Sequence, residues 1–246
     1  MELLTVAHPG EPALDMAVSH ALLRRVAAGE LPETARIFRP GATLAFGRLD
    51  AQSPGYAAAR TAAVGLGWAP VVRLGGGRAA AYDPGSVVLE LVTRNARVAE
   101  GLQERFAAGV RLFVAALEGV GVAAEVGELP GEYCPGRWSL HLHDGPKVAG
   151  AALRAVRGAT LFTAVVVVEG GARVRAAITA VYDALALPWD PATAGALEDQ
   201  RPGLTSPEVA GALADELVRR SGAVARVGLD AVTLAAAREL LPVHAA

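Results

Sequence analysis

The sequence predicts an α+β domain in which helices pack on one side of a central sheet. Segments rich in β-branched residues fill the middle of the chain, and helical patterns precede and follow them. Of the 246 residues, 52% are hydrophobic and 20% are charged, which is enough apolar material for one sizeable core. A doubly wound parallel sheet would alternate strands and helices regularly, so this class is disfavoured. We expect a single domain over residues 1–246, with a helical segment from about 173 to 246.

The N-terminal part is predicted to hold a helix, two strands and a second helix. Residues 11–29 carry apolar side chains at helical spacing and end in glycine, a common residue at a helix C-terminus. The segments 35–39 and 43–46 are short and apolar, and a Pro-Gly turn separates them, which predicts two strands. A second Pro-Gly pair opens a helix expected at about 54–66.

The central part is predicted to be mostly strand. Residues 71–73 form a short strand that runs into three glycines, and 86–92 is strongly β-branched. The longest helical pattern, 99–121, places its large apolar residues on one face. Short strands are expected at 122–126 and 138–142.

Two strands and three helices are predicted for the rest of the chain. The strands are expected at 147–153 and 161–168; both are largely apolar, and the second is rich in valine. The helices are expected at 173–186, 206–220 and 229–241, and a Ser-Pro pair opens the second of them.

Charge and cysteine content exclude several classes of protein. A net charge of −2 leaves no basic surface that would displace counterions from nucleic acid. A single cysteine cannot form an internal disulfide, which excludes a secreted disulfide scaffold. No apolar run approaches the roughly 18 residues of a membrane span, and the first residues lack the pattern of a signal peptide. We therefore expect a cytoplasmic protein with no membrane or nucleic-acid partner.

A glycine-rich segment after the strand at 71–73 is the first candidate binding site. In Arg73-Leu74-Gly75-Gly76-Gly77-Arg78, three glycines let backbone N–H groups approach a ligand, and two arginines suit an anionic or carbonyl-bearing substrate. The segment matches neither a dinucleotide fingerprint nor a P-loop, and a plain tight turn is as good an interpretation. Nearby, Tyr82-Asp83-Pro84-Gly85-Ser86 is compatible with a site wall or with an Asx-type turn, the usual role of such an aspartate.

The only cysteine, Cys134, precedes a Pro-Gly turn between two expected strands. A lone cysteine is more often a small buried hydrophobe than a nucleophile, but a turn of this kind can direct its side chain into a cleft. Attack at neutral pH needs a neighbouring cation that stabilises the thiolate. Our candidate is Lys147, which opens an otherwise apolar strand and is followed by Gly150; a solvent-facing lysine is the ordinary alternative.

The five histidines do not form a metal site. His141 and His143 alternate on an expected strand, but no cluster of Cys, His or carboxylates completes a tetrahedron nearby, so we expect no metal. Both histidines lie within ten residues of Cys134. A Cys-His dyad therefore stays open as an alternative, ranked below the Cys-Lys pair.

Taken together, these segments resemble the catalytic domain of the biotin/lipoate protein ligases over about residues 11–220. The early strand pair, 36–40 and 44–48, is similar to that of the family, and Arg73 to Gly77 followed by Asp83-Pro84-Gly85 resembles its acyl-binding loop. The closest resemblance is to its lipoate-protein ligase A-like branch of cysteine-dependent octanoyl or lipoyl amidotransferases. The segment that carries it is Cys134-Pro135-Gly136-Arg137-Trp138-Ser139-Leu140, continued by Lys147-Val148-Ala149-Gly150 and Arg154.

The resemblance implies a mixed, largely antiparallel sheet with flanking helices and an acyl tunnel beside the glycine loop. It implies transfer of an octanoyl or lipoyl group to a lysine of lipoyl-domain or glycine-cleavage H-type carrier proteins, without a cofactor. Cys134 would form a thioester with the acyl group, and Lys147 would hold the carbonyl oxygen and favour the thiolate. The substrate-binding residues would be Arg73, Gly75, Gly76, Gly77, Tyr82, Asp83 and Gly150.

Two alternatives stay open beside the transferase. In an ATP-dependent lipoate ligase, which needs ATP and Mg, Lys147 would bind the acyl-adenylate carbonyl and Cys134 would be a bystander. The segment 79–83 lacks the histidine usual in ligases, which favours the transferase. The third hypothesis is a non-catalytic binding module for acyl groups or small acids, because Ser139 replaces an aspartate of the signature and its glutamine is missing from 150–154.

Overall fold

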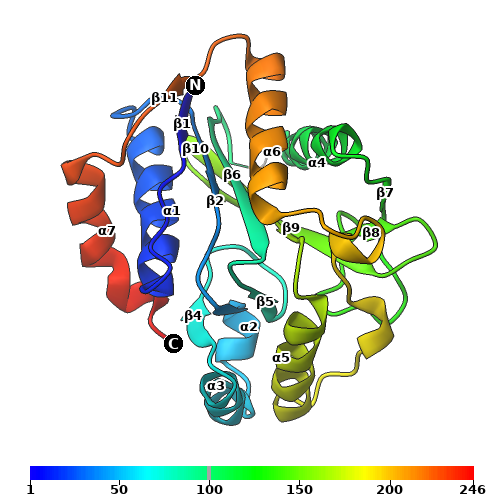
Figure 1. Ribbon diagram of the computed structural model, residues 1–246. Coiled ribbons are helices and arrows are strands. Elements are labelled where there is room, and N and C mark those ends of the chain that lie inside the picture. Colours follow the sequence, from blue (N-terminus) through cyan, green and yellow to red (C-terminus); the bar gives the residue numbers. More distant parts are fainter. Residues whose placement is uncertain (99–100) are drawn as a thin grey trace.

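The computed structural model of the chain describes residues 1–98 and 101–246. Over these residues an eight-stranded sheet forms the centre, in the order β11-β1-β2-β6-β10-β9-β8-β7 (Figure 1). Its strands are β1 (Glu2–Leu4), β2 (Thr34–Phe38), β6 (Ser86–Arg94), β7 (Ala124–Val126), β8 (Leu140–Leu142), β9 (Lys147–Val156), β10 (Ala159–Val167) and β11 (Ala225–Arg226). Strand β1 pairs in parallel with β2 and β11, and the other described pairs of this sheet are antiparallel. The expected mixed, largely antiparallel sheet is confirmed.

A small second sheet holds both ends of the glycine loop. Its strands are β3 (Thr43–Phe46), β4 (Ala69–Val72) and β5 (Ala80–Tyr82), in the order β4-β3-β5. The loop leaves β4 and returns into β5, so the two strands on either side of β3 fix where it begins and ends. Helices α2 (Arg48–Ala51) and α3 (Tyr56–Gly65) connect β3 to β4.

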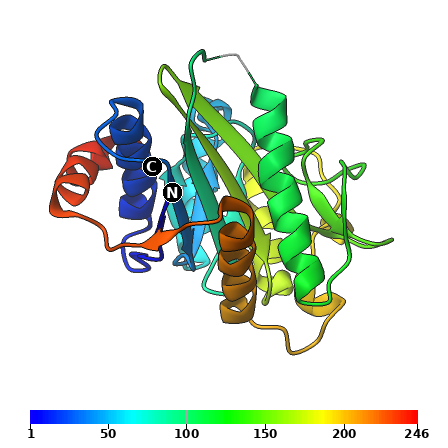
Figure 2. The same cartoon turned by 90° about the horizontal axis from the view of Figure 1, so that it is seen from above.

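The larger helices cover both faces of the central sheet. Seen from above, α4 (Leu102–Gly119) and α6 (Ser206–Ser221) lie on one side, and α1 (Pro12–Ala27) and α7 (Ala231–His244) on the other (Figure 2). Helix α5 (Gly171–Ala184) packs against α3. The expectation of helices on one side only is therefore wrong. The reason is that neighbouring residues of β6, such as Val87 and Val88, are both buried, so both faces need a cover.

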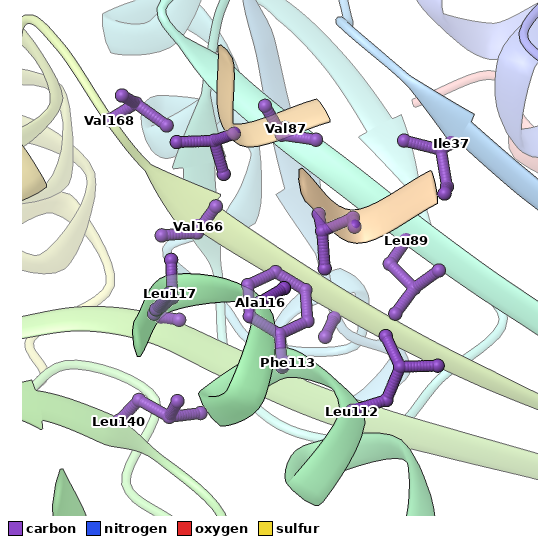
Figure 3. Close-up of a cluster of buried hydrophobic side chains, with 14 of the residues drawn as sticks. Ile37, Val87, Leu89, Leu112, Phe113, Ala116, Leu117, Leu140, Val166 and Val168 are labelled. Atoms are coloured by element: carbon purple, nitrogen blue, oxygen red, sulfur yellow. The ribbon is translucent and has the colours of Figure 1, made fainter. Parts of the chain in front are cut away.

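The face under α4 is a packed hydrophobic core (Figure 3). Phe113 and Leu117 of α4 point towards Val166 of β10 and Leu89 of β6, and all four side chains are buried. The helical spacing of the α4 residues and the alternation of the strand residues bring these apolar faces together.

Several short elements carry no sequence signal of their own. These are β1, β5, β11, α2 and two single 3-10 turns at 191–193 and 197–199. The expected start of the longest helix, residues 99 and 100, lies outside the described residues. Within the described part of the chain, no helix has both the length and the apolarity that a membrane crossing requires.

Candidate functional site

The only cysteine lies in a turn whose backbone is held in an unusual conformation. Cys134 has φ +42°, in the left-handed region that side chains other than glycine seldom adopt. Its N–H donates to the Tyr182 hydroxyl of α5 at 2.7 Å, and that hydroxyl donates to the Ala79 carbonyl, 3.1 Å away. One tyrosine thus joins the cysteine turn to the segment that follows the glycine loop. This link fixes the direction in which the thiol points.

The cation nearest to the thiol is Arg73 at the end of β4. Its Nη2 donates to Cys134 Sγ at 3.3 Å and to the Arg78 carbonyl at 2.7 Å. Burial opposes the guanidinium charge, but the contact with Cys134 raises the pKa of Arg73 above its ordinary value, so the group is charged. A fixed positive charge beside a sulfur stabilises negative charge on it. The sequence predicted Lys147 in this place, and that expectation is corrected: the guanidinium of Arg73 makes the contact.

Lys147, the first residue of β9, instead holds the backbone of the cysteine turn. Its Nζ donates to Glu132 Oε1 at 3.0 Å and to the carbonyls of Tyr133 and Cys134 at 2.9 and 3.0 Å. The side chain is only 2% exposed, and burial lowers the pKa of its ammonium. Lys147 and Cys134 are therefore neighbours, as the sequence suggested, but through the carbonyl of the cysteine rather than its sulfur.

Sequence reasoning missed Glu132, the acceptor that holds Lys147 in place. Its Oε1 also accepts hydrogen bonds from the Ser139 hydroxyl at 2.6 Å and from the Gly136 N–H at 3.1 Å. The buried carboxylate thus ties together both ends of the turn and the lysine. Ser139, which departs from the family signature, has a defined place in this network. The signal available in the sequence was an acidic residue two positions before the only cysteine.

The glycine loop closes over the thiol, and its first and last glycines are required for different reasons. A Cβ on Gly77, which has φ +93°, would lie 2.6 Å from Arg73 Nη2 and 2.7 Å from Cys134 Sγ. A Cβ on Gly75 would lie 2.7 Å from that of Ala152 on β9. Gly76 has open space around it. Only a chain without side chains at 75 and 77 therefore approaches the sulfur and the sheet this closely.

These groups surround one end of a cavity of about 440 Å3. Its wall includes eight of the candidate site residues: Cys134, Lys147, Arg73, Gly75, Gly76, Gly77, Tyr82 and Gly150. Much of the remaining wall is apolar and comes from β6, β9, β10 and α1: Met16, Val88, Leu153, Leu161, Val165 and Val167. The cavity therefore has a thiol in its wall and a largely apolar lining.

Asp83 does not line this cavity, so its expected substrate role is withdrawn. Its Oδ1 accepts the Gly85 N–H at 3.0 Å, and its Oδ2 pairs with Arg173 of α5 at 2.6 Å. This is an Asx-type turn, the ordinary alternative for an aspartate before Pro-Gly.

The histidine dyad is also excluded. His141 lies beside the Leu142 carbonyl, and His143 pairs with Glu125 at the surface, so neither reaches Cys134 or lines the cavity. Across the described residues, no group of three or more metal-ligating side chains comes together.

Comparison with known sequences places the domain in a family. Residues 11–188 match the model of the lipoyl protein ligase A/B catalytic domain. The octanoyl-[GcvH]:protein N-octanoyltransferase of Geobacillus kaustophilus is 30% identical over 160 residues, which are 65% of this chain and 56% of the relative. The enzyme of that name from Anoxybacillus flavithermus is 27% identical, over 65% of this chain and 57% of its own. The chain thus spans little more than half the length of these curated relatives.

Solved structures share the fold over nearly the whole chain. Lipoate-protein ligase A bound with ATP superposes with a TM-score of 0.78 at 19% identity, covering 98% of this chain and 94% of that one. A bi-partite lipoate protein ligase from Thermoplasma acidophilum gives 0.76 at 19% identity, covering 98% and 91%. With the matched catalytic-domain model over residues 11–188, the chain belongs to the lipoyl protein ligase A/B catalytic domain family.

Proposed function

We propose that the protein transfers an octanoyl or lipoyl group to a lysine of a lipoyl-domain or glycine-cleavage H-type carrier protein through a thioester on Cys134. The observation that carries the proposal is the thiol facing an apolar cavity with a guanidinium 3.3 Å from its sulfur. The relatives named octanoyl-[GcvH]:protein N-octanoyltransferase support the acyl group and the carrier. The reaction needs neither ATP nor a metal. The protein acts in the cytoplasm.

The transfer proceeds in two half-reactions that exchange one bond for another. In the first, the sulfur of Cys134 attacks the acyl carbonyl carbon of the donor and forms an S–C bond. The bond from that carbon to the donor amide nitrogen breaks, and the thiol proton leaves on the donor amine. The amine of the acceptor lysine then attacks the thioester carbon. A new C–N bond forms, the S–C bond breaks, and the sulfur recovers a proton from the attacking amine.

The two cations have separate tasks in this proposal. Arg73 stabilises negative charge on the sulfur before attack and after it leaves. Lys147 holds the cysteine turn through two backbone carbonyls, and its charge at the cavity wall stabilises the oxyanion that forms on the acyl carbon. The N–H groups of the glycine loop lie along the acyl group near its carbonyl.

The first experiment incubates the purified protein with an octanoylated carrier protein, without ATP, and measures its intact mass. We expect one added octanoyl group on the wild type and none on Cys134→Ala or Cys134→Ser. Adduct formation by Cys134→Ser at the wild-type rate would contradict the thioester. Release of pyrophosphate with lipoate and ATP, without any adduct from the octanoylated donor, would instead favour the ATP-dependent ligase.

The pH dependence provides a second test of Lys147. An ammonium that must stay protonated loses its effect as the pH rises through its pKa, and burial lowers the pKa of Lys147 below its ordinary value of 10.5. The rate of thioester formation should therefore fall on the alkaline side at a pH below 10.5. Lys147→Met should lower the rate at every pH and remove that alkaline decline.

A further inference from the structure

The chain contains a single lysine among its 23 lysine and arginine residues, and this lysine is buried. Lys147 is 2% exposed, and within the described residues Glu132 is its one ion-pair partner, with 3.0 Å between Nζ and Oε1. The carbonyls of Tyr133 and Cys134 accept the other two hydrogens of the ammonium, at 2.9 and 3.0 Å. Each of the three hydrogens therefore has an acceptor, and Nζ is held in one position.

Glu132 also compensates the charge of this buried ammonium. Burial lowers the pKa of Lys147, the charges of Glu132 and Cys134 raise it, and the charge of Arg73 opposes them. The Tyr133 ring lies 4.7 Å from Nζ, but burial raises the pKa of this tyrosine, so the ring is neutral. A thioester on Cys134 is uncharged as well. During the transfer Glu132 is therefore the anion, among these neighbours, that keeps the ammonium protonated.

Ser139 occupies the position at which the family signature has an aspartate, and its side chain touches this same carboxylate. The Ser139 hydroxyl donates to Glu132 Oε1 at 2.6 Å, and the oxygen that it contacts is the one that pairs with Lys147. A carboxylate extends one bond farther from the backbone than a hydroxyl does. An aspartate at position 139 would therefore bring an oxygen to the place that Oε1 occupies. Positions 132 and 139 thus meet at one point beside Nζ, where two carboxylates would repel each other.

The two positions approach this point from different segments. Ser139 directly precedes β8, which pairs with β9, the strand that Lys147 begins. Glu132 belongs to the cysteine turn, and its carboxylate accepts the N–H groups of Leu129 at 3.2 Å and of Gly136 at 3.1 Å. A carboxylate on Glu132 therefore holds the lysine and the backbone on both sides of the cysteine at the same time.

We propose that Glu132 is a positioning residue that supplies, from the cysteine turn, the carboxylate that an aspartate at position 139 would place beside Lys147. The action of Lys147 on the acyl carbonyl rests on the proposed function above, whereas its pairing with Glu132 does not. Ser139 then removes no part of the site, because its hydroxyl completes the set of donors around Glu132. The departure from the signature at this position gives no support to a non-catalytic binding module.

The first test measures the pKa of Lys147 directly by NMR. Because the chain has one lysine, protein made with 13C-labelled lysine gives one lysine side-chain signal, whose shift with pH follows this ammonium. We expect a lower pKa in Glu132→Gln than in the wild type, because the ammonium loses its anion. Glu128→Gln is the matched control, since it removes an exposed carboxylate four positions earlier, and it should leave the pKa unchanged. An unchanged pKa in Glu132→Gln would refute the proposal.

Two double variants that differ only in the charge at position 139 test the exchange of positions. Glu132→Ser with Ser139→Asp returns a carboxylate to the point beside Nζ, whereas Glu132→Ser with Ser139→Asn puts a neutral side chain of similar size there. We expect the first to recover most of the wild-type pKa of Lys147 and the second to resemble Glu132→Gln. Folding of the first variant alone, seen by circular dichroism, would also support the proposal. Equal pKa values in the two, or unfolding of both, would overturn it.

The octanoyl adduct on Cys134 is measured on the same proteins, so the pairing and the proposed function are tested separately. At pH 7 we expect Glu132→Gln to form the adduct roughly tenfold more slowly or worse, since it weakens the stabilisation of the oxyanion. Glu132→Ser with Ser139→Asp should recover much of the rate, and its asparagine counterpart should not. Equal rates in these two would overturn the proposal. A wild type that forms no adduct, with the NMR results as expected, would refute the thioester and leave the pairing in place.

Discussion

The two faces of the central sheet are made by the same strands, but the face under α1 buries charged side chains of β2 and β6 beside its apolar ones. On the α4 face, Ile37 of β2 lies opposite Leu89 of β6, and both are buried among apolar side chains (Figure 3). One residue earlier on β2 and one later on β6, Arg36 lies opposite Glu90, and both are equally buried on the α1 face. Because side chains alternate along a strand, a single position separates a filled core from a polar cavity wall. The face under α4 stabilises the fold, whereas the face under α1 forms the cavity at some cost in stability.

Arg36→Leu should show the largest effect of any change on the cavity face. It leaves the carboxyl groups of Asp15 and Glu90 buried without their shared cation, which typically costs about 3–5 kcal/mol. We expect a free energy of unfolding in urea lower by about that amount. The matched control is Arg39→Leu, an exposed arginine just after the same strand, which should change it by less than about 1 kcal/mol. Similar losses of unfolding free energy in both variants would show that Arg36, Asp15 and Glu90 do not stabilise the protein as a group.

Gly77→Ala should impair the site and leave the packed face intact. The added Cβ would meet Arg73 Nη2 and Cys134 Sγ at 2.6 and 2.7 Å, so the guanidinium and the thiol must separate. We expect thioester formation to slow about a hundredfold, which corresponds to about 2.7 kcal/mol. Gly76→Ala is the control, because nothing lies within 4 Å of its Cβ. If thioester formation slowed as much in Gly76→Ala as in Gly77→Ala, the loop would need the flexibility of glycine rather than the space beside the sulfur.

Two adjacent valines of β6 compare the faces directly. Val87 belongs to the packed core, whereas Val88 lines the cavity, and both are buried. Val87→Ala should cost about 2–3 kcal/mol because the lost methyl groups leave a new void. Val88→Ala only enlarges an existing cavity, so we expect about 1 kcal/mol, together with tighter binding of longer acyl chains. If the two substitutions lowered the free energy of unfolding in urea equally, Val87 and Val88 would be packed equally tightly and the two faces would not differ in this respect.

The sequence predicted the strands of both faces because their apolar and β-branched patterns are local. It also indicated the cavity residues that stand in recognisable segments, namely the glycine loop, Cys134 and Lys147. It did not predict which cation meets the thiol. Arg73 and Cys134 are brought together by the pairing of β4 with β3 and by the contact of Tyr182, and both depend on residues far apart in the chain. Strands of two or three residues, such as β11 and β5, are too short to show an alternation of apolar and polar residues, and they form only by pairing with strands far away in the sequence.

For Asp83 the error is the opposite one, because the role implied by the family motif was preferred to the role that the local sequence predicts. Its position before Pro-Gly predicted an Asx turn, and the Gly85 contact has that geometry. Glu90 was seen only as part of a β-branched strand. Its polarity within an apolar run was the signal, because a carboxyl group at a core position needs a partner.

The contact between α1 and α7 on the cavity face should add a small dependence of stability on pH. His20 Nδ1 lies 3.1 Å from His244 Nε2, and His244 Nδ1 lies 2.8 Å from the Val72 carbonyl, so both rings fit best when neutral. Burial, followed by the charge of Arg24, lowers the pKa of His20 from 6.5 to about 4. Below pH 6.5 the unfolded chain therefore binds a proton that the folded chain refuses, and stability falls as the pH decreases towards 4.

His20→Gln should reduce this acid loss by about 1 kcal/mol at pH 5, because solvent partly screens the partly exposed ring, and should change little at pH 7. The measurement is the urea midpoint of both proteins across pH 4 to 7. His143 is the control of opposite sign: its hydrogen bond to Glu125 raises its pKa, so it contributes stability at low pH that is lost as the pH rises. If His143→Gln protected against acid as well as His20→Gln does, the sensitivity would not belong to the α1–α7 contact. An effect of His20 alone would instead show that acidification destabilises the protein through the contact between α1 and α7 on the cavity face. The packed face under α4 would then contribute nothing to the acid sensitivity.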